Sequence, residues 1–348
     1  MNFDELISYA KQEGCSDVHI TVGTALAIRQ FGKLKMLDPV PTAEESKAMI
    51  LEYLTEEQRE KILAGEDLDF ALIIKDGTRL RANVYHQRNN LAATYRLLQE
   101  KIPTFDDLEI PEAVRKLVRE PRGLILVTGP TGSGKTTTLA SMVDYVNKKE
   151  AKHVITIEDP IEYVYYHSKS MIHQREVGKD VDTFAKALRS ALREDPDIIL
   201  VGEMRDYETI SAAITAAETG HLVLSTLHTT SAAQTIERII DAYPPHGQAQ
   251  ARTQLASVLK GSVTQVLVPL ENEDGMTIAT EVLINNDAIA NQIRENKTHQ
   301  IPSTILSGGS VGMHSLNSDL KRLEREGRIS RETALKFCSS PKEYESAR

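Results

Sequence analysis

Residues 123–138 read GLILVTGPTGSGKTTT. The run before Gly129 is apolar and of strand length, and residues Gly129 to Thr136 match the pattern G-x-x-x-x-G-K-[ST]. Apolar residues at helical spacing follow from Leu139 to Val146. This order of strand, glycine-rich turn and helix predicts a loop that binds phosphate.

The residue types of the loop suit ATP. Its glycines allow backbone angles that turn successive N–H groups inward, and the next helix presents its positive end. We expect Lys135 to reach the β- and γ-phosphates and the Thr136 hydroxyl to hold Mg²⁺. The predicted nucleotide-binding residues are Gly129, Pro130, Thr131, Gly132, Ser133, Gly134, Lys135, Thr136 and Thr137.

The composition limits the class of protein. A length of 348 residues allows about two domains. The net charge of −9 argues against a broad nucleic-acid surface, although a local basic groove stays compatible with it. Two distant cysteines and no C-x-x-C pair favour a reducing cytoplasm. An acidic N-terminus and no apolar run of spanning length predict contact with a membrane only through partner proteins.

The first hundred residues combine helix and strand signals. Helices are expected at 3–11, 43–52 and 56–64, short apolar segments at 17–22 and 25–31, and strands at 68–74, 79–87 and 91–98. If Asn89-Asn90 is a two-residue turn, Arg81 and Arg96 become diagonal neighbours on one face. Two interpretations stay open. The pair is part of a solvated face, or it is unpaired and binds an anion such as a nucleotide phosphate on a neighbouring subunit.

The rest of the chain predicts a second domain. Glu100 to Pro111 is polar and marked by prolines, as expected of a linker. Alternating strands and helices then favour a mainly parallel sheet with helices on both faces. Further strands are expected at 153–157, 197–201, 222–226, 262–268 and 277–284, with helices at 183–194 (capped by Asp182), 206–219 (capped by Asp206), 232–241 and 247–259. The tail at 287–338 predicts a helical subdomain with a flexible turn at 307–310.

Polar residues follow the strands at the edge where α/β sheets bind ligands. Glu158 and Glu162 follow one strand, Glu203 the next, and His228 the third, whereas His221 begins that third strand and should lie farther away. Hydrolysis of ATP needs a metal, a group that orients water, and cations. We expect Glu203 to bind the metal and His228 to sense the γ-phosphate. Glu162 is the first candidate for the residue that orients the water, and Glu158 is the alternative.

For two of these residues a purely structural role stays open beside the catalytic one. Glu158 is equally suited to hold a loop by accepting backbone N–H bonds, and His228 could be a structural histidine. Gly202 also stands where the Walker B aspartate of other NTPases is usual, which leaves Glu203 as the acidic group.

Four motifs resemble the Walker A, Asp box, Walker B and His box of the type II/IV secretion ATPases, which drive type II secretion and type IV pili. They lie at 129–137, 156–162, 193–206 and 219–230. Segments 16–20, 84–88 and 312–316 are similar to the PilT-type pilus retraction branch. The resemblance implies an N-terminal α+β PAS-like domain at 1–99, a linker at 100–112, a RecA-like P-loop NTPase core at 113–285 and a C-terminal helical part at 286–348.

The resemblance also implies a homohexamer with ATP between the two domains, acting at an inner-membrane pilus platform protein. It makes Glu162 the catalytic glutamate, Glu203 the Walker B glutamate, His221 and His228 the His box, and Arg81 and Arg96 arginine fingers. One departure stands out, because Ala290 replaces the usual first arginine of a C-terminal motif of which Ile293-Arg294-Glu295 remains. Alternatives are an assembly, competence or type II secretion motor, a nucleic-acid translocase, and an ATP-binding scaffold without turnover.

Overall fold

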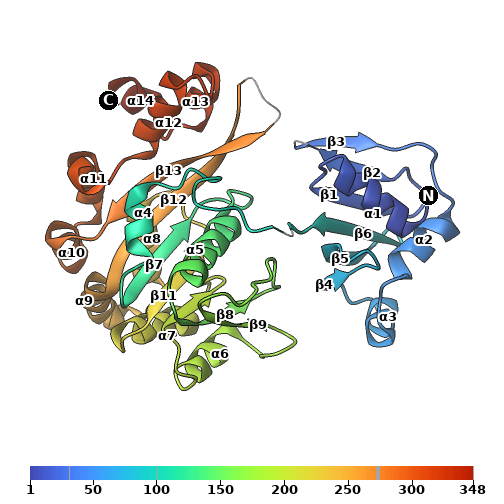
Figure 1. Ribbon diagram of the computed structural model, residues 1–348, viewed down its shortest axis with the longest axis horizontal. Helices are drawn as coiled ribbons and strands as arrows, with labels where there is room; N and C mark the ends of the chain where they lie inside the picture. Colours follow the sequence, from blue (N-terminus) through green and yellow to red (C-terminus); the bar gives the residue numbers. More distant parts are fainter. Residues whose placement is uncertain (31, 100, 272–274, 348) are drawn as a thin grey trace. The chain divides into compact units, whose positions relative to one another are not determined.

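The computed structural model describes residues 1–30, 32–99, 101–271 and 275–347 and shows two compact units (Figure 1). The first unit consists of Met1–Lys101 together with the short segment Pro160–Val164. The second unit takes the rest of the described chain. Phe31, at the end of an expected apolar segment, and Glu100, the first residue of the expected linker, lie outside the described residues.

The first unit is an antiparallel sheet with three helices. Its strands are ordered β3-β2-β1-β6-β5-β4. Their bounds are β1 (Asp17–Thr21), β2 (Ala27–Gln30), β3 (Lys33–Met36), β4 (Leu68–Ile73), β5 (Arg79–Gln87) and β6 (Asn90–Leu97). The helices are α1 (Phe3–Gln12), α2 (Ala43–Leu51) and α3 (Glu56–Leu63). Each helix begins with a capping box, from Asn2, Thr42 and Thr55 respectively, which satisfies its first N–H groups.

The turn between β5 and β6 lies one residue earlier than we expected from the sequence. Gln87 pairs with Asn90, so Arg88 and Asn89 are the two turn residues, and both have positive φ (51° and 61°). Positive φ at both central positions is the geometry of a type I′ hairpin turn, which matches the twist of the flanking strands. The register therefore shifts by two residues, and Arg81 faces Arg96 directly instead of diagonally.

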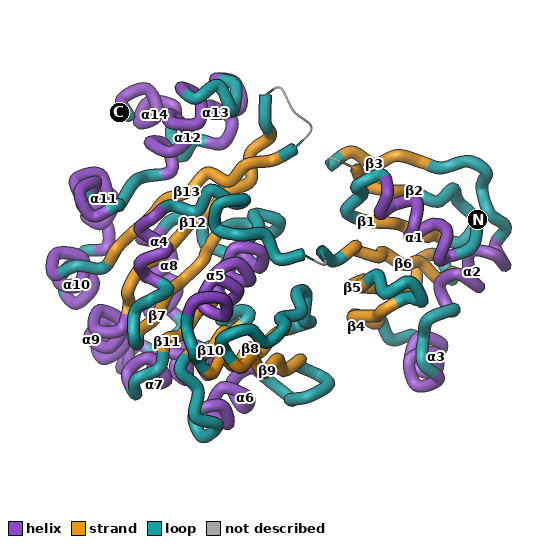
Figure 2. Tube along the Cα trace, in the orientation of Figure 1, coloured by secondary structure: helices purple, strands orange, loops and turns teal. Residues whose placement is uncertain are grey.

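The second unit is built on a seven-stranded sheet (Figure 2) with the order β13-β12-β7-β11-β10-β8-β9. All neighbouring strands are parallel except β12 and β13. The strands are β7 (Gly123–Thr128), β8 (His153–Glu158), β9 (Met171–Glu176), β10 (Ile198–Val201), β11 (Leu222–Leu227), β12 (Leu259–Pro269) and β13 (Met276–Ile284). The sequence patterns gave no indication of β9.

Helices cover both faces of this sheet. Leu124 and Leu126 belong to a cluster with residues of α6 to α10, while the alternate residues Ile125 and Val127 are also fully buried and point to the other face. The helices of the core are α4 (Glu112–Leu117), α5 (Lys135–Lys149), α6 (Phe184–Ala191), α7 (Tyr207–Glu218), α8 (Ala232–Asp241) and α9 (Gln248–Val258). Asp206 caps α7 as expected, but the cap of α6 is Thr183 and not Asp182, which instead pairs with Lys186.

The C-terminal part is helical, with α10 (Asp287–Arg294), α11 (Ile301–Ser307), α12 (Leu316–Arg325), α13 (Arg331–Phe337) and α14 (Pro341–Ser346). In the expected turn at 307–310, Gly308 is closely packed, because a Cβ there would lie 2.8 Å from the sulfur of Met313, whereas Gly309 has nothing within 4 Å. His314 is attached to β13 by two backbone hydrogen bonds to Val282. In the described part of the chain, no helix combines the length and apolar character needed to cross a membrane.

Candidate active site

The glycine-rich loop follows β7 and leads into α5, as the sequence predicts. Gly134 caps α5 with φ of 85°, and Gly129 has φ of 142°. A Cβ at Gly129 would lie 2.2 Å from the backbone oxygen of Gln265, so no side chain fits there. The loop is therefore fixed as a backbone cradle against β12.

Two polar groups of the loop suit a phosphate ligand. The Lys135 ammonium donates to the carbonyls of Gly129 and Pro130, at 3.0 and 2.9 Å, which holds its positive charge over the loop. The Ser133 hydroxyl is buried and has no hydrogen-bond partner among the described residues. A glycine cradle, an ammonium group and an unsatisfied hydroxyl fit the phosphates of a nucleotide.

Three of the predicted residues meet at one edge of the sheet. Strands β7, β11, β10 and β8 are parallel neighbours, so their carboxyl ends lie together, beside the start of the loop. Glu158 is the last residue of β8, Glu203 lies two residues after β10, and His228 directly follows β11. His228 Nε2 lies 3.4 Å from one carboxylate oxygen of Glu203, and the Arg205 guanidinium lies 2.6 Å from the other. The edge thus gathers carboxylate and imidazole groups as predicted.

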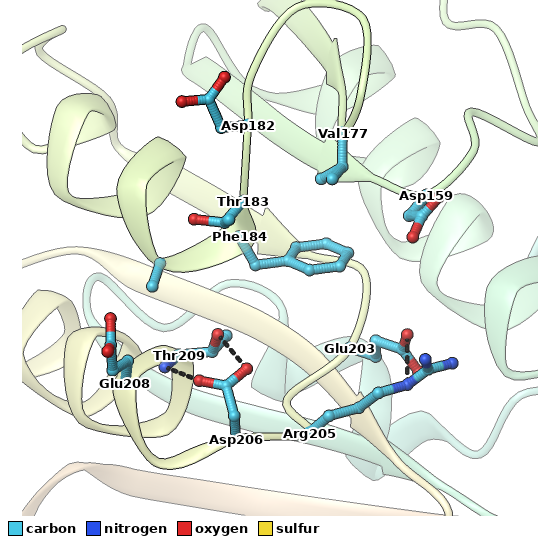
Figure 3. A pocket seen from close by; sticks show the side chains of 11 residues that line it. Asp159, Val177, Asp182, Thr183, Phe184, Glu203, Arg205, Asp206, Glu208 and Thr209 are labelled. Carbon is cyan, nitrogen blue, oxygen red and sulfur yellow. Dashed lines mark hydrogen bonds and ion pairs between the residues drawn. The ribbon is translucent and has the colours of Figure 1, made fainter.

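A pocket of about 420 Å³ opens beside Glu203 (Figure 3). Glu203 and Arg205 lie next to each other at one side, with the ring of Phe184 between them and Thr183. Most of the other polar groups in its lining have local partners. Asp206, for example, accepts from the backbone N–H and the hydroxyl of Thr209 at 2.9 Å each.

Gly202, directly after β10, lies close to the backbone of the neighbouring strand β8. A Cβ at this position would lie 3.2 Å from the backbone oxygen of Ile157 on β8, which is tighter than ordinary contact. An aspartate at this position would meet the same obstacle. The first acidic side chain that the strand end can present is therefore that of Glu203.

Glu158 is held by side chains. The Thr156 hydroxyl donates to its carboxylate at 2.6 Å, and the Gln174 amide donates to the same oxygen at 3.2 Å. Gln174 lies on β9 and also accepts from the backbone N–H of Tyr165 at 2.9 Å. Glu158 thus joins two strands and the chain that returns after the Asp box, which favours the structural interpretation.

Glu162 belongs to the short segment that packs in the first unit. There Arg79 donates to the carbonyl of Glu162 at 2.7 Å and to that of Ile161 at 2.6 Å. The Arg81 guanidinium lies 3.8 Å from the Glu162 carboxylate. Arg79 was not singled out in the sequence, since its role depends on Glu162, which lies 83 residues away in the chain.

The two candidate arginine fingers are paired, which contradicts the one of the two open interpretations in which they are unpaired. Arg81 makes a two-point contact with Asp69, at 3.1 and 2.9 Å. Arg96 contacts Asp17 at 2.9 Å. The neighbouring strands supply both carboxylates, which the sequence pattern could not reveal.

His221 lies at the amino end of β11, whereas the loop lies at the carboxyl ends of the strands. It precedes Leu222, which pairs with Gly123 at the start of β7, and its Nδ1 lies 3.0 Å from the carbonyl of Ala216. The length of β11 separates it from His228, roughly 20 Å at the usual rise per strand residue. Within this chain His221 does not join the predicted nucleotide-binding residues.

Comparisons with known proteins agree with this geometry. The sequence profile of the family described as "Type II/IV secretion system protein" matches residues 2–308. The chain belongs to this family. Over 99% of its own length and 100% of that protein, the chain is 43% identical to PilT, the type IV pilus retraction ATPase of Pseudomonas aeruginosa.

A solved structure extends the similarity to the fold. The crystal structure of the pilus retraction motor PilT with bound ADP matches with a TM-score of 0.90 and 45% identity, covering 99% of both chains. The type II secretion system protein E of P. aeruginosa is 37% identical, but over 68% of this chain and 48% of that protein. The sequence resemblance to secretion ATPases is thereby confirmed, together with the α/β fold.

The C-terminal motif is packed into the second unit. Ala290 is 7% exposed and lies in the core cluster with Ile289 and Ile293 on α10. Arg294, in the last turn of the helix, is exposed. The small side chain at 290 thus fits a buried surface of the helix.

Proposed function

We propose that this chain is an ATP-hydrolysing motor that retracts type IV pili. The observation that carries the proposal is similarity to PilT over nearly the whole of both chains, joined to a loop whose buried hydroxyl and ammonium suit phosphate. The type II secretion relative shares only part of its length with this chain, so an assembly or secretion motor is the second candidate.

The proposed chemistry assigns each residue a task. Bound MgATP supplies the phosphoanhydride bond and the metal charge that offsets its phosphates. Lys135 and the loop N–H groups bind phosphate oxygens. Glu162 orients the attacking water, and His228 contacts the terminal phosphate.

Thr136 and Glu203 are the proposed protein contributions to the Mg²⁺ site. Among the described residues no group of three or more His, Cys, Asp or Glu side chains is arranged to hold a metal ion. Mg²⁺ in nucleotide sites is commonly bound by one or two protein groups together with substrate phosphates and water. A hydroxyl and one carboxylate are therefore sufficient for the role that we propose.

Arg81 and Arg96 would stabilise charge in the transition state on a neighbouring subunit of a homohexamer. Their present pairs do not prevent this, since the side chain of Arg96 is 56% exposed and that of Arg81 is 31% exposed. Ion pairs at such positions are worth about 0–1 kcal/mol. Exchange of Asp69 for a phosphate would therefore cost little, because the Asp69 side chain is 46% exposed. Release of Arg96 from Asp17 would cost more, because the Asp17 side chain is only 8% exposed. The proposed partner is the pilus platform protein at the inner face of the cell membrane.

The test compares ATP turnover of the purified wild type, Glu203→Ala and Glu208→Ala, with the mass of the oligomer recorded for each. Glu208 lines the same pocket but lies 3.6 Å from Arg189, away from the proposed chemistry. We expect a hexamer whose turnover is lost in Glu203→Ala and kept in Glu208→Ala. Tight ATP binding without turnover in the wild type would overturn the motor and support a scaffold.

Whether the motor retracts or assembles pili is tested with a strain that lacks the protein. Retraction predicts that pili accumulate on cells that lack the protein and that twitching stops, whereas an assembly motor predicts loss of pili. Hydrolysis stimulated by single-stranded DNA would instead support a translocase.

A further inference from the structure

Gln265 is a buried polar residue next to the phosphate loop. It lies on β12 one residue beyond Thr264, which pairs with Thr128 at the end of β7, and it is 0% exposed. Its position is therefore opposite Gly129, where the strand ends and the loop begins. Neither the sequence motifs nor the roles proposed above involve it.

Both polar atoms of the Gln265 side-chain amide form hydrogen bonds. Its Nε2 donates to the carbonyl of Ser133 at 2.6 Å, and its Oε1 accepts from the Thr138 hydroxyl at 2.9 Å. The same Nε2 would lie 3.2 Å from a Cβ at Gly134. One side chain thus joins the end of the loop to the first turn of α5.

The hydrogen bond to Ser133 sets the direction of a backbone donor. In a planar trans peptide the carbonyl of one residue and the N–H of the next point to opposite sides. Because the Ser133 carbonyl is held on Gln265, the N–H of Gly134 points away from β12. The Thr138 bond fixes the rotation of α5, and with it the placement of Lys135 and Thr136.

We propose that Gln265 is a positioning residue for nucleotide binding, which holds the Ser133–Gly134 peptide and the start of α5 in the orientation that binds the phosphates of ADP or ATP. This inference rests on the proposed function of the loop. Loss of the Gln265 amide leaves the buried Ser133 carbonyl and Thr138 hydroxyl without a hydrogen-bond partner. The Ser133–Gly134 peptide can then rotate, so that the N–H of Gly134 no longer points at phosphate.

The test measures the Kd of ADP for the full chain by calorimetry, with the wild type, Gln265→Leu and Asn285→Leu. Asn285 is the matched control, since it is another side-chain amide that joins two elements. Its Nδ2 donates to the backbone carbonyls of Ala256 on α9, at 3.0 Å, and of Leu259 at the other end of β12, at 2.8 Å. We expect both variants to have a lower Tm. Only Gln265→Leu should weaken ADP binding, by roughly tenfold or more, as expected when hydrogen bonding to a charged group is disturbed.

A third variant, Gln265→Glu, separates positioning from packing and serves if Gln265→Leu does not fold. At pH 9 its ionised carboxylate cannot donate to Ser133, so ADP binding should be weak. Because residue 265 is 0% exposed, burial raises the pKa of the new carboxyl. As the pH is lowered to 6 the protonated fraction grows and regains a donor, so binding should recover relative to the wild type at the same pH. Gln265→Leu should show no such recovery.

The outcomes are distinct. If the wild type does not bind ADP, the proposed function fails and the positioning role fails with it. If the wild type binds ADP and Gln265→Leu binds it within twofold, the positioning role alone is overturned. Equal weakening of binding in Asn285→Leu also overturns it, because loss of stability would then explain the result.

Discussion

Replacement of Gly129 by alanine tests how strictly the loop is shaped by β12. The new Cβ would lie 2.2 Å from the backbone oxygen of Gln265, in a strand that is paired on both sides. Gly132→Ala is the matched control, because Gly132 also has positive φ (79°) but has nothing within 4 Å of the added atom. Both alanines have an unfavourable backbone conformation, which costs about 1–3 kcal/mol.

The overlap with Gln265 should add about 1–3 kcal/mol in Gly129→Ala alone, the usual cost of overpacking. At about 2–4 °C per kcal/mol for a unit of this size, Gly129→Ala should melt roughly 2–12 °C below Gly132→Ala. The assay is differential scanning calorimetry of the full chain, following the transition that ADP raises in the wild type. Equal melting temperatures for the two variants would refute the idea that the β12 backbone restricts residue 129.

Three further predictions concern other contacts. Arg79→Met removes two charged hydrogen bonds to the segment of Glu162, so kcat should fall at least about tenfold while the Kd of ADP stays within threefold; a matching rise in Kd would contradict this. Burial lowers the pKa of His314, so the folded protein favours the neutral imidazole. The free energy of unfolding should therefore be highest above pH 6.5 and should decrease as the pH falls below it, by up to about 1.4 kcal/mol per pH unit. Unfolding of His314→Gln between pH 5 and 7 should lack that slope. Burial raises the pKa of Glu281, so Glu281→Gln, which keeps an oxygen for the N–H of Ala232, should raise Tm at pH 8; an unchanged or lower value would show that the ionised carboxylate is tolerated.

Local signals in the sequence predicted most of the elements. Capping residues placed α2, α3 and α7, and the apolar runs placed the parallel strands, because both depend on neighbours in the chain. Glu203 and His228 could be predicted to meet, since both follow parallel strands whose carboxyl ends share an edge.

Features that depend on distant partners were missed. Strand β9 reads MIHQRE, in which Ile172 is buried but most neighbours are polar, because it is an edge strand. The hairpin turn was misplaced because Arg88, an unusual residue at positive φ, occupies its first position. Gln265 and Arg79 carry no local motif, and their roles follow from carbonyl groups that only folding brings within reach.

The segment Pro160–Val164 has a consequence for dividing this protein into pieces. The chain passes between the two units after Lys101, before Pro160 and after Val164, so no single cut separates them. A fragment that starts at Ile102 would keep Glu162 but lack Arg79 and Arg81, which hold its carbonyl and face its carboxylate. Loss of hydrolysis in such a truncated protein would therefore be no measure of what the ATPase core can do. Co-expression of residues 1–101 as a separate polypeptide is the complementation that a truncation study would need.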